Sequence, residues 1–150
     1  MDIANISKYI SMIDRDFNYY LNKHLKEYNL GKHDIWVMKE INAEAGINQN
    51  EICNNIGVDK ITVSKSVKKL VDLDYVESHK DSEDKRVSRL YMTSKGKSYR
   101  EQIIAVIRKT DDIIMKNLTD DEKNIIEDIM KRMSESIHDE ALKTRDDVSK

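Results

Sequence analysis

Hydrophobic residues recur at helical spacing along the first third of the chain. They run from Ile3 through Ile6, Ile10, Ile13, Phe17, Tyr20 and His24 to Tyr28. Alternating steps of three and four residues place them on one face of a long helix, which Leu30 and Gly31 end. A second helix is predicted around Ile35, Trp36, Met38 and Ile41. We expect it to end near Gly46, because glycine adopts the left-handed conformation that stops helices.

Two short helices are predicted next, joined by a turn. Asn48 to Glu51 fits a capping box, with an Asn N-cap and a Glu three residues later, and it begins a helix that carries Ile52, Cys53 and Ile56. The turn Gly57–Asp59 follows, and Asp59 caps a helix over Lys60–Asp72. On that helix Val63, Val67 and Leu70 share the inward face. Such a pair indicates a helix-turn-helix motif.

The spacing of the hydrophobic residues then changes from that of helices to that of strands. Tyr75–His79 and Val87–Met92 predict a hairpin whose tip is the polar stretch Lys80–Arg86. Thr93 caps a long amphipathic helix carrying Tyr99, Ile103, Val106 and Ile113. A second capping box, Thr119 to Glu122, begins a last helix with Ile125, Ile129, Met133 and Ile137.

The predicted fold class is therefore mainly α, of α+β type, in one domain over residues 1–150. The order is two helices, a short strand, two helices, two strands and two helices. A helix-turn-helix followed by a hairpin is a winged helix. In that arrangement the second helix of the pair fits the major groove of DNA, and the hairpin contacts phosphates or the minor groove.

The outward face of the Lys60–Asp72 helix combines short hydroxyl groups with lysines, which suits base edges and phosphates respectively. The candidate DNA-binding residues on it are Lys60, Ile61, Thr62, Ser64, Lys65, Lys68 and Lys69. A merely solvated helix face is the alternative interpretation of the same residues.

The hairpin tip is acidic on balance, so DNA binding there depends on which of its side chains face the DNA. We expect Lys85 and Arg86 to face the DNA, because arginine suits the negative potential of a narrow minor groove. Asp84 would hold Arg89 and so orient the tip. The alternative is an ordinary polar hairpin whose surface ion pairs contribute about 0–1 kcal/mol each.

The net charge of −2 conceals an asymmetry. Residues 47–97 hold 10 basic and 8 acidic side chains, whereas residues 110–150 hold 7 and 12. The distribution permits DNA binding by the middle of the chain. The longest apolar run, Ile103–Ile107, is too short for a membrane span or a signal peptide, and the single cysteine fits a reducing compartment. We therefore expect a cytoplasmic protein without a membrane partner.

Three other classes of function have less support. Cys53 lies between Ile52 and Ile56 and is expected to pack as a small hydrophobe, although a redox role stays open. His24, His33, His79 and His138 are dispersed, and we expect neither a metal nor a cofactor. No phosphate loop, nucleophile elbow or metalloprotease motif is present, so no enzymatic activity is expected.

In the hairpin, Asp84-Lys85-Arg86 is followed by Leu90, Met92 and Thr93 and then by Ser94-Lys95-Gly96-Lys97. This sequence resembles the wing signature of MarR-type transcriptional regulators. Gln49–Ile56 and Ile61–Leu70 are similar to that family's helix-turn-helix. Two positions depart from the pattern: Asp74 stands where a glycine usually ends the recognition helix, and Ser78 where a basic residue often follows the start of the first wing strand.

The resemblance implies a DNA-binding lobe over residues 47–97, in which Gln49 also contacts DNA, and dimerisation helices over residues 1–30 and 98–142. It further implies a homodimeric repressor on a pseudo-palindromic double-stranded operator. A small phenolic or aromatic effector would bind between the dimerisation helices and the lobe, where Tyr9, Phe17 and Trp36 are candidate contacts. The apolar helix surface supports a dimer independently. A winged helix that binds another protein instead of DNA is the alternative.

Overall fold

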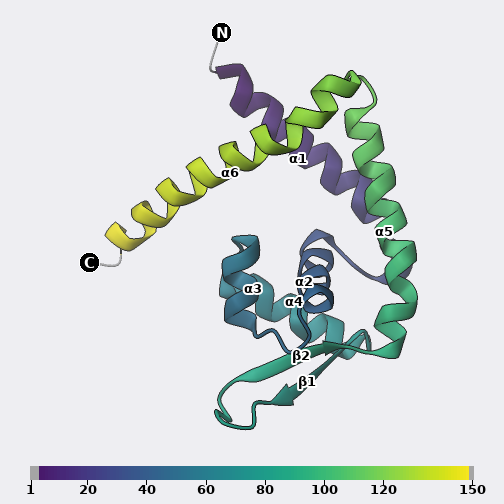
Figure 1. The fold of residues 1–150 in the computed structure, drawn as a ribbon, viewed down its shortest axis with the longest axis vertical. Coiled ribbons are helices and arrows are strands. Elements are labelled where there is room, and N and C mark those ends of the chain that lie inside the picture. Colours follow the sequence, from purple (N-terminus) through teal and green to yellow (C-terminus); the bar gives the residue numbers. More distant parts are fainter. Residues whose placement is uncertain (1–3, 149–150) are drawn as a thin grey trace. The chain divides into compact units, whose positions relative to one another are not determined.

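The computed structural model describes residues 4–148, and Figure 1 shows its course. The elements are α1 (Ala4–His24), the 3₁₀ turn η1 (Lys26–Tyr28), α2 (Lys32–Ala43), α3 (Gln49–Ile56), α4 (Lys60–Asp72), β1 (Val76–Lys80), β2 (Ser88–Met92), α5 (Ser94–Met115) and α6 (Asp120–Val148). Two compact units divide after Thr110. The mainly helical winged helix-turn-helix expected from the sequence is confirmed.

The core of the first unit lies where α2, α3, α4 and the two-stranded sheet meet. Its fully buried side chains come from every one of these elements, and they include Ile41, Ile52, Val63, Leu70 and Leu90. Burying each such aliphatic side chain contributes about 1.5–3 kcal/mol. The inward positions predicted for the Lys60–Asp72 helix are thus confirmed, and Ser66 is buried beside them.

The predicted helix caps are also confirmed. The Asn48 side chain accepts from the backbone N–H groups of Asn50 and Glu51, and Glu51 accepts from the Asn48 N–H at 2.8 Å. Asp59 Oδ1 accepts from the Thr62 N–H at 2.9 Å. Each contact satisfies N–H groups that a helix start leaves without a partner, which fixes where α3 and α4 begin.

The first helix is shorter than predicted. α1 ends at His24, and the chain passes through η1 to Asn29, which takes a left-handed φ of 54°. Leu25 is fully buried and Tyr28 packs edge-to-face on Tyr99, so tertiary contacts redirect the chain before Leu30. The helical placement of Tyr28 was therefore wrong. Ile3, the start of the expected stripe, lies outside the described residues.

β1 and β2 pair antiparallel, with Val76 opposite Met92 and Lys80 opposite Ser88. The short strand expected before the helix-turn-helix is absent within residues 4–148. That segment still joins the sheet, because the Gly46 N–H donates to Leu90 O at 2.8 Å and the Leu90 N–H donates to Ile47 O at 3.1 Å. Gly46 has a φ of 89° but lies after the end of α2, so it shapes this connection and not the helix terminus.

Asp74 performs the turn that a glycine usually makes. Its φ is 60°, in the left-handed region where Asp is better tolerated than most residues. The Tyr75 N–H donates to Leu70 O at 2.9 Å, and Thr93 Oγ1 donates to the Asp74 carbonyl at 2.7 Å. These bonds hold the step from α4 into β1, so the departure from the family pattern leaves the turn intact.

The last two helices begin at the predicted caps. Thr93 Oγ1 accepts from the Gly96 N–H at 2.9 Å, and the Thr119 N–H donates to Glu122 at 2.7 Å. α5 spans 22 residues and α6 spans 29, and large hydrophobic side chains remain exposed on both. In the described part of the chain, none of the helices is long and apolar enough to cross a membrane.

Candidate nucleic-acid interface

The outward face of α4 carries the side chains that the sequence assigned to DNA. Ile61, Ser64, Lys65, Lys68 and Lys60 are all exposed, whereas Thr62 is half-buried. The burial of Val63, Val67 and Leu70 on the opposite face fixes this orientation. The helix therefore presents a polar, lysine-bearing surface that is anchored from behind by the core.

Two lysines of this face have no carboxylate partner among the residues that the structure describes. Lys60 and Lys65 make no ion pair with any residue between positions 4 and 148. Lys68 lies 3.5 Å from Asp72, but both side chains are more than half exposed, so solvent weakens that attraction. These three ammonium groups are available to an external anion.

Thr62 is already committed to the start of α4. Its hydroxyl donates to Asp59 Oδ2 at 2.7 Å, while its N–H bonds to the other carboxylate oxygen. These hydrogen bonds, the one from the Thr62 N–H first, lower the pKa of Asp59. The hydroxyl of Thr62 therefore supports the Asp59 cap, and only its acceptor capacity is left for a ligand.

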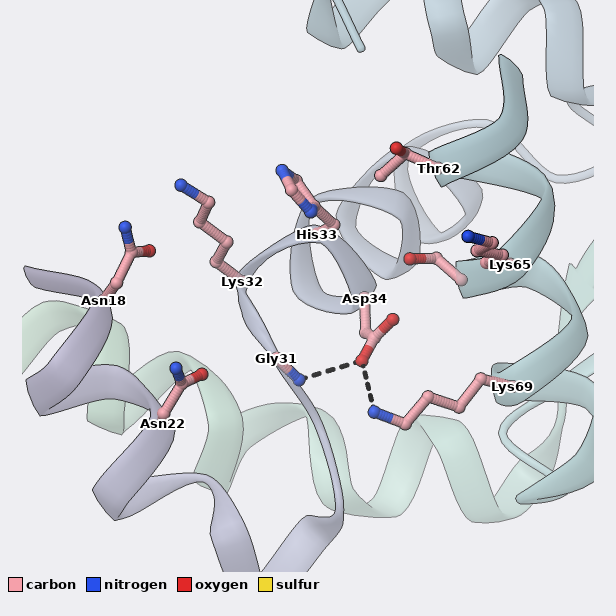
Figure 2. A pocket seen from close by; sticks show the side chains of 10 residues that line it. Asn18, Asn22, Gly31, Lys32, His33, Asp34, Thr62, Lys65 and Lys69 are labelled. Atoms are coloured by element: carbon pink, nitrogen blue, oxygen red, sulfur yellow. Dashed lines mark hydrogen bonds and ion pairs between the residues drawn. The ribbon is translucent and has the colours of Figure 1, made fainter. Parts of the chain in front are cut away.

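Lys69 is less exposed than Lys65 and Lys68, and it pairs with a carboxylate of α2. Its Nζ donates to Asp34 Oδ2 at 2.8 Å, and the same oxygen accepts from the Gly31 N–H at 2.8 Å (Figure 2). Asp34 is buried at the start of α2. An ionised carboxylate in such a place requires a partner. Lys69 therefore joins α4 to α2, and a contact between it and DNA stays a prediction.

At the hairpin, Asp81 takes the orienting role that the sequence gave to Asp84. Arg89 Nε donates to Asp81 Oδ2 at 2.7 Å, and Arg89 Nη1 donates to Gly46 O at 3.2 Å. Asp81 also accepts from the N–H groups of Glu83 and Asp84. The Asp84 N–H and then the Arg89 guanidinium hold the pKa of Asp81 well below its usual range. The carboxylate is thus ionised at neutral pH and ties the tip to the sheet.

Asp84 pairs with Arg86, so the expected contact between Asp84 and Arg89 was wrong. Arg86 Nε lies 3.1 Å from Asp84 Oδ1, and the guanidinium is 91% exposed. Lys85 is exposed and makes no ion pair within the described part of the chain. Both cations project from the tip, and a pair this exposed contributes little to stability. A phosphate could replace Asp84 as the partner of Arg86.

Gln49 begins α3 and is half-buried, with no side-chain hydrogen bond to the described residues. Nearby, Glu51 lies 3.8 Å from Arg89, which links the cap of α3 to the base of the hairpin. Sequence reasoning missed this link, and it missed Asp34 and Asp81. Only the concentration of turn-forming residues at positions 81–84 signalled that a carboxylate there would bind backbone N–H groups.

A pocket of about 430 Å³ lies between α1, the start of α2 and α4 (Figure 2). All of its lining residues except Gly31 have polar side chains, and four of these are basic; they are Asn18, Asn22, Gly31, Lys32, His33, Asp34, Thr62, Lys65, Ser66 and Lys69. Tyr9, Phe17 and Trp36 do not line it. Tyr9 is 56% exposed, and Phe17 packs against the core.

For the other two candidate sites, a redox-active cysteine and a metal site, the geometry of the described residues adds no support. Cys53 is half-buried against the core, and burial raises the pKa of its thiol, which disfavours the reactive thiolate. No group of three or more His, Cys, Asp or Glu side chains within residues 4–148 is arranged to hold a metal ion.

Comparisons with known proteins agree with this geometry. A model of the MarR family matches residues 28–87. An uncharacterised HTH-type transcriptional regulator of Bacillus subtilis, YybA, is 24% identical over 133 residues, which cover 89% of each chain. A solved MarR protein from Peptoclostridium difficile is 30% identical with a TM-score of 0.87, over 96% of this chain and 94% of that one.

A third comparison concerns a structure with a ligand. A mutant MarR from E. coli, solved in complex with operator DNA, is 24% identical with a TM-score of 0.77. The match covers 88% of this chain and 95% of that one. At this identity the likeness concerns the fold.

Proposed function

The chain belongs to the MarR family of helix-turn-helix transcriptional regulators, and from that premise we propose that it is a homodimeric repressor of a pseudo-palindromic operator. Members of this family are transcriptional regulators and not enzymes. Each protomer would place α4 in the major groove of one half-site and its hairpin over the adjacent backbone. A dimer that covers promoter DNA competes with RNA polymerase, and repression follows from that competition.

One observation carries the proposal: the outward face of α4 holds ammonium groups that have no counter-ion in the described part of the chain. Lys60 and Lys65 are exposed on a rigid helix whose other face is buried in the core. Charges of this kind are attracted to phosphates and release counter-ions on binding. The Lys69–Asp34 ion pair sharpens the assignment, because it separates a structural lysine from those that face outward.

Apolar side chains on three helices support the homodimer. They are exposed in the single chain, and they are Tyr9, Ile10, Met12 and Ile13 on α1, Ile113 and Ile114 on α5, and Ile125, Met130, Met133 and Ile137 on α6. Repeated exposure of large hydrophobic groups at helical spacing is typical of a surface that a second copy covers. A two-fold dimer then requires half-sites about 10 base pairs apart, or a multiple of that distance.

Arg86→Ala tests the wing. The variant should bind the operator roughly tenfold more weakly, because each hairpin loses the guanidinium that faces the DNA. Thermal unfolding should be unchanged, since Arg86 is exposed and Asp84 is its one ion-pair partner among residues 4–148. Fluorescence anisotropy titrations with the duplex that flanks the protein's own gene measure the affinity of the wild type and of the variant. Lys39→Ala, which removes an exposed positive charge from α2, is the matched control and should bind as the wild type does. Equal affinity of the Arg86 variant and the wild type would contradict the role of the hairpin.

We also propose that the effector is an aromatic molecule with an acidic group that binds in the pocket of Figure 2. Lys65 belongs both to the wall of this pocket and to the outward face of α4. An anion bound there would attract the Lys65 ammonium and so weaken the attraction between this ammonium and the DNA. The polar wall suits a carboxylate better than the all-aromatic site inferred from Tyr9, Phe17 and Trp36.

Benzoate and benzyl alcohol test this assignment as a matched pair. Millimolar benzoate should release labelled operator from the protein, whereas benzyl alcohol and an equal concentration of sodium chloride should not. Lys32→Ala, which removes a cation from the pocket but none from the outward face of α4, should weaken the response. Release of the DNA by both compounds to the same extent would contradict an anion-selective pocket.

A further inference from the structure

Ile61 is the large hydrophobic side chain that α4 exposes most. It is 69% exposed, against 38% for Val71 near the other end of the same helix. Ile61 is not among the residues that pack against the core. Its surroundings are polar, because Lys60 and Thr62 flank it in the chain and Ser64 and Lys65 follow at helical spacing. The fold therefore does not require an isoleucine at this position.

The place of Ile61 on α4 is more informative than its exposure alone. It lies in the first turn of the helix, and the first turns of recognition helices contact base edges. In that turn the Thr62 hydroxyl already donates to Asp59. Lys60 carries a point charge suited to a phosphate. Ile61 is thus the exposed side chain of the first turn that can make an apolar contact with a base.

We propose that Ile61 recognises the 5-methyl group of a thymine in each half-site of the operator. The inference rests on the proposed function and deepens it. Among the groups that base pairs present in the major groove, the thymine methyl is the apolar one. Contact between it and the isoleucine removes apolar surface of both from water. The neighbouring Ser64 hydroxyl, which has no hydrogen-bond partner among the described residues, lies one turn further along the same face.

Deoxyuridine provides the test, since it pairs like thymidine and lacks only the methyl group. The full-length protein first selects a duplex from a random library. Each thymine of that duplex is then replaced by deoxyuridine in both half-sites at once. At one or two positions the wild type should lose about fourfold in affinity per half-site, or about 15-fold in total.

Variants identify the side chain responsible. Ile61→Ala should bind the thymine duplex about as weakly as the wild type binds the deoxyuridine duplex, and deoxyuridine should weaken it no further. Val71→Ala removes an exposed hydrophobic group from the same helix, so it is the matched control and should keep the full response to deoxyuridine. Both side chains are exposed, so circular dichroism and thermal unfolding should match the wild type.

Three outcomes would overturn the inference. Tight binding by the wild type with no response to deoxyuridine at any position would show that no methyl is recognised, while the proposed function would stand. An equal response in the wild type and in Ile61→Ala would assign the methyl contact to another residue. Failure to select or bind any duplex would overturn the proposed function, and the thymine contact with it.

Discussion

Gly96→Ala is expected to destabilise the first unit by about 2–4 kcal/mol, the largest effect on stability among the variants considered. Gly96 is buried in the first turn of α5, where the helix meets the start of β1. A Cβ there would overlap the carbonyl oxygen of Tyr75 and lie 2.8 Å from Met92 Cε. The Met92 side chain can move, but the backbone of Tyr75 is held by the hydrogen bond from the Thr93 N–H at 3.1 Å.

Urea unfolding followed by circular dichroism measures this effect, and Gly31→Ala is the matched control. A Cβ at Gly31 would lie 3.7 Å from the nearest atom, Asp34 Oδ2, which is an ordinary contact. We expect the control to lose less than about 1 kcal/mol, because glycine is only a moderately better N-cap than alanine. If both variants unfold at the same urea concentration, the close approach of α5 to β1 is wrong.

Lys65→Met and Lys69→Met are expected to affect different properties, DNA binding and stability respectively, although the two lysines are neighbours four residues apart on one helix. Lys65→Met should weaken operator binding by about 1–3 kcal/mol per protomer and reduce the salt slope by about one unit per protomer, or about two for the dimer, with no change in stability. Its ammonium is exposed and makes no ion pair with residues 4–148. Anisotropy titrations at several salt concentrations provide the affinity and the slope.

Lys69→Met should instead lower the free energy of unfolding by about 1–3 kcal/mol, because it leaves Asp34 buried without its cation. The salt slope of DNA binding should stay at the wild-type value, since Lys69 is occupied 2.8 Å from Asp34. Asp34→Asn in the Lys69→Met background should restore part of the lost stability. A reduced salt slope in Lys69→Met would show that this lysine contacts a phosphate.

Local signals in the sequence were sufficient for most of the fold. Asn48, Asp59, Thr93 and Thr119 each begin a helix where the capping pattern placed it, because capping depends on residues only two or three positions away. The inward face of α4 followed from spacing alone. Asp74 adopts the left-handed conformation that its position before a strand demanded.

The errors came from contacts between residues far apart in sequence. Periodicity continued the first helix to Tyr28, whereas the packing of Leu25 and the Tyr28–Tyr99 ring contact turn the chain after His24. The 35-residue separation of Asp34 and Lys69 hid their ion pair from any local pattern.

At the hairpin, the sequence also left an ion pair undetermined, although the residues concerned are close together in the chain. Asp81 and Asp84 are both close enough in sequence to Arg89 to pair with it. Which of them pairs with Arg89 depends on which carboxylate the turn orients towards the sheet. In this turn it is the carboxylate of Asp81. Sequence patterns placed basic side chains on the exposed face of α4 and at the hairpin tip, but they did not determine which charges neutralise one another.

The central claim is that two chains together bind one DNA duplex through basic groups on α4 and the hairpin. Sedimentation velocity of the full-length protein with a fluorescent, library-selected duplex tests it most directly, at 50 and 200 mM salt. We predict a complex of two chains per duplex whose affinity falls about a thousandfold or more between those concentrations. A monomer that leaves every duplex unbound at 50 mM salt would contradict it.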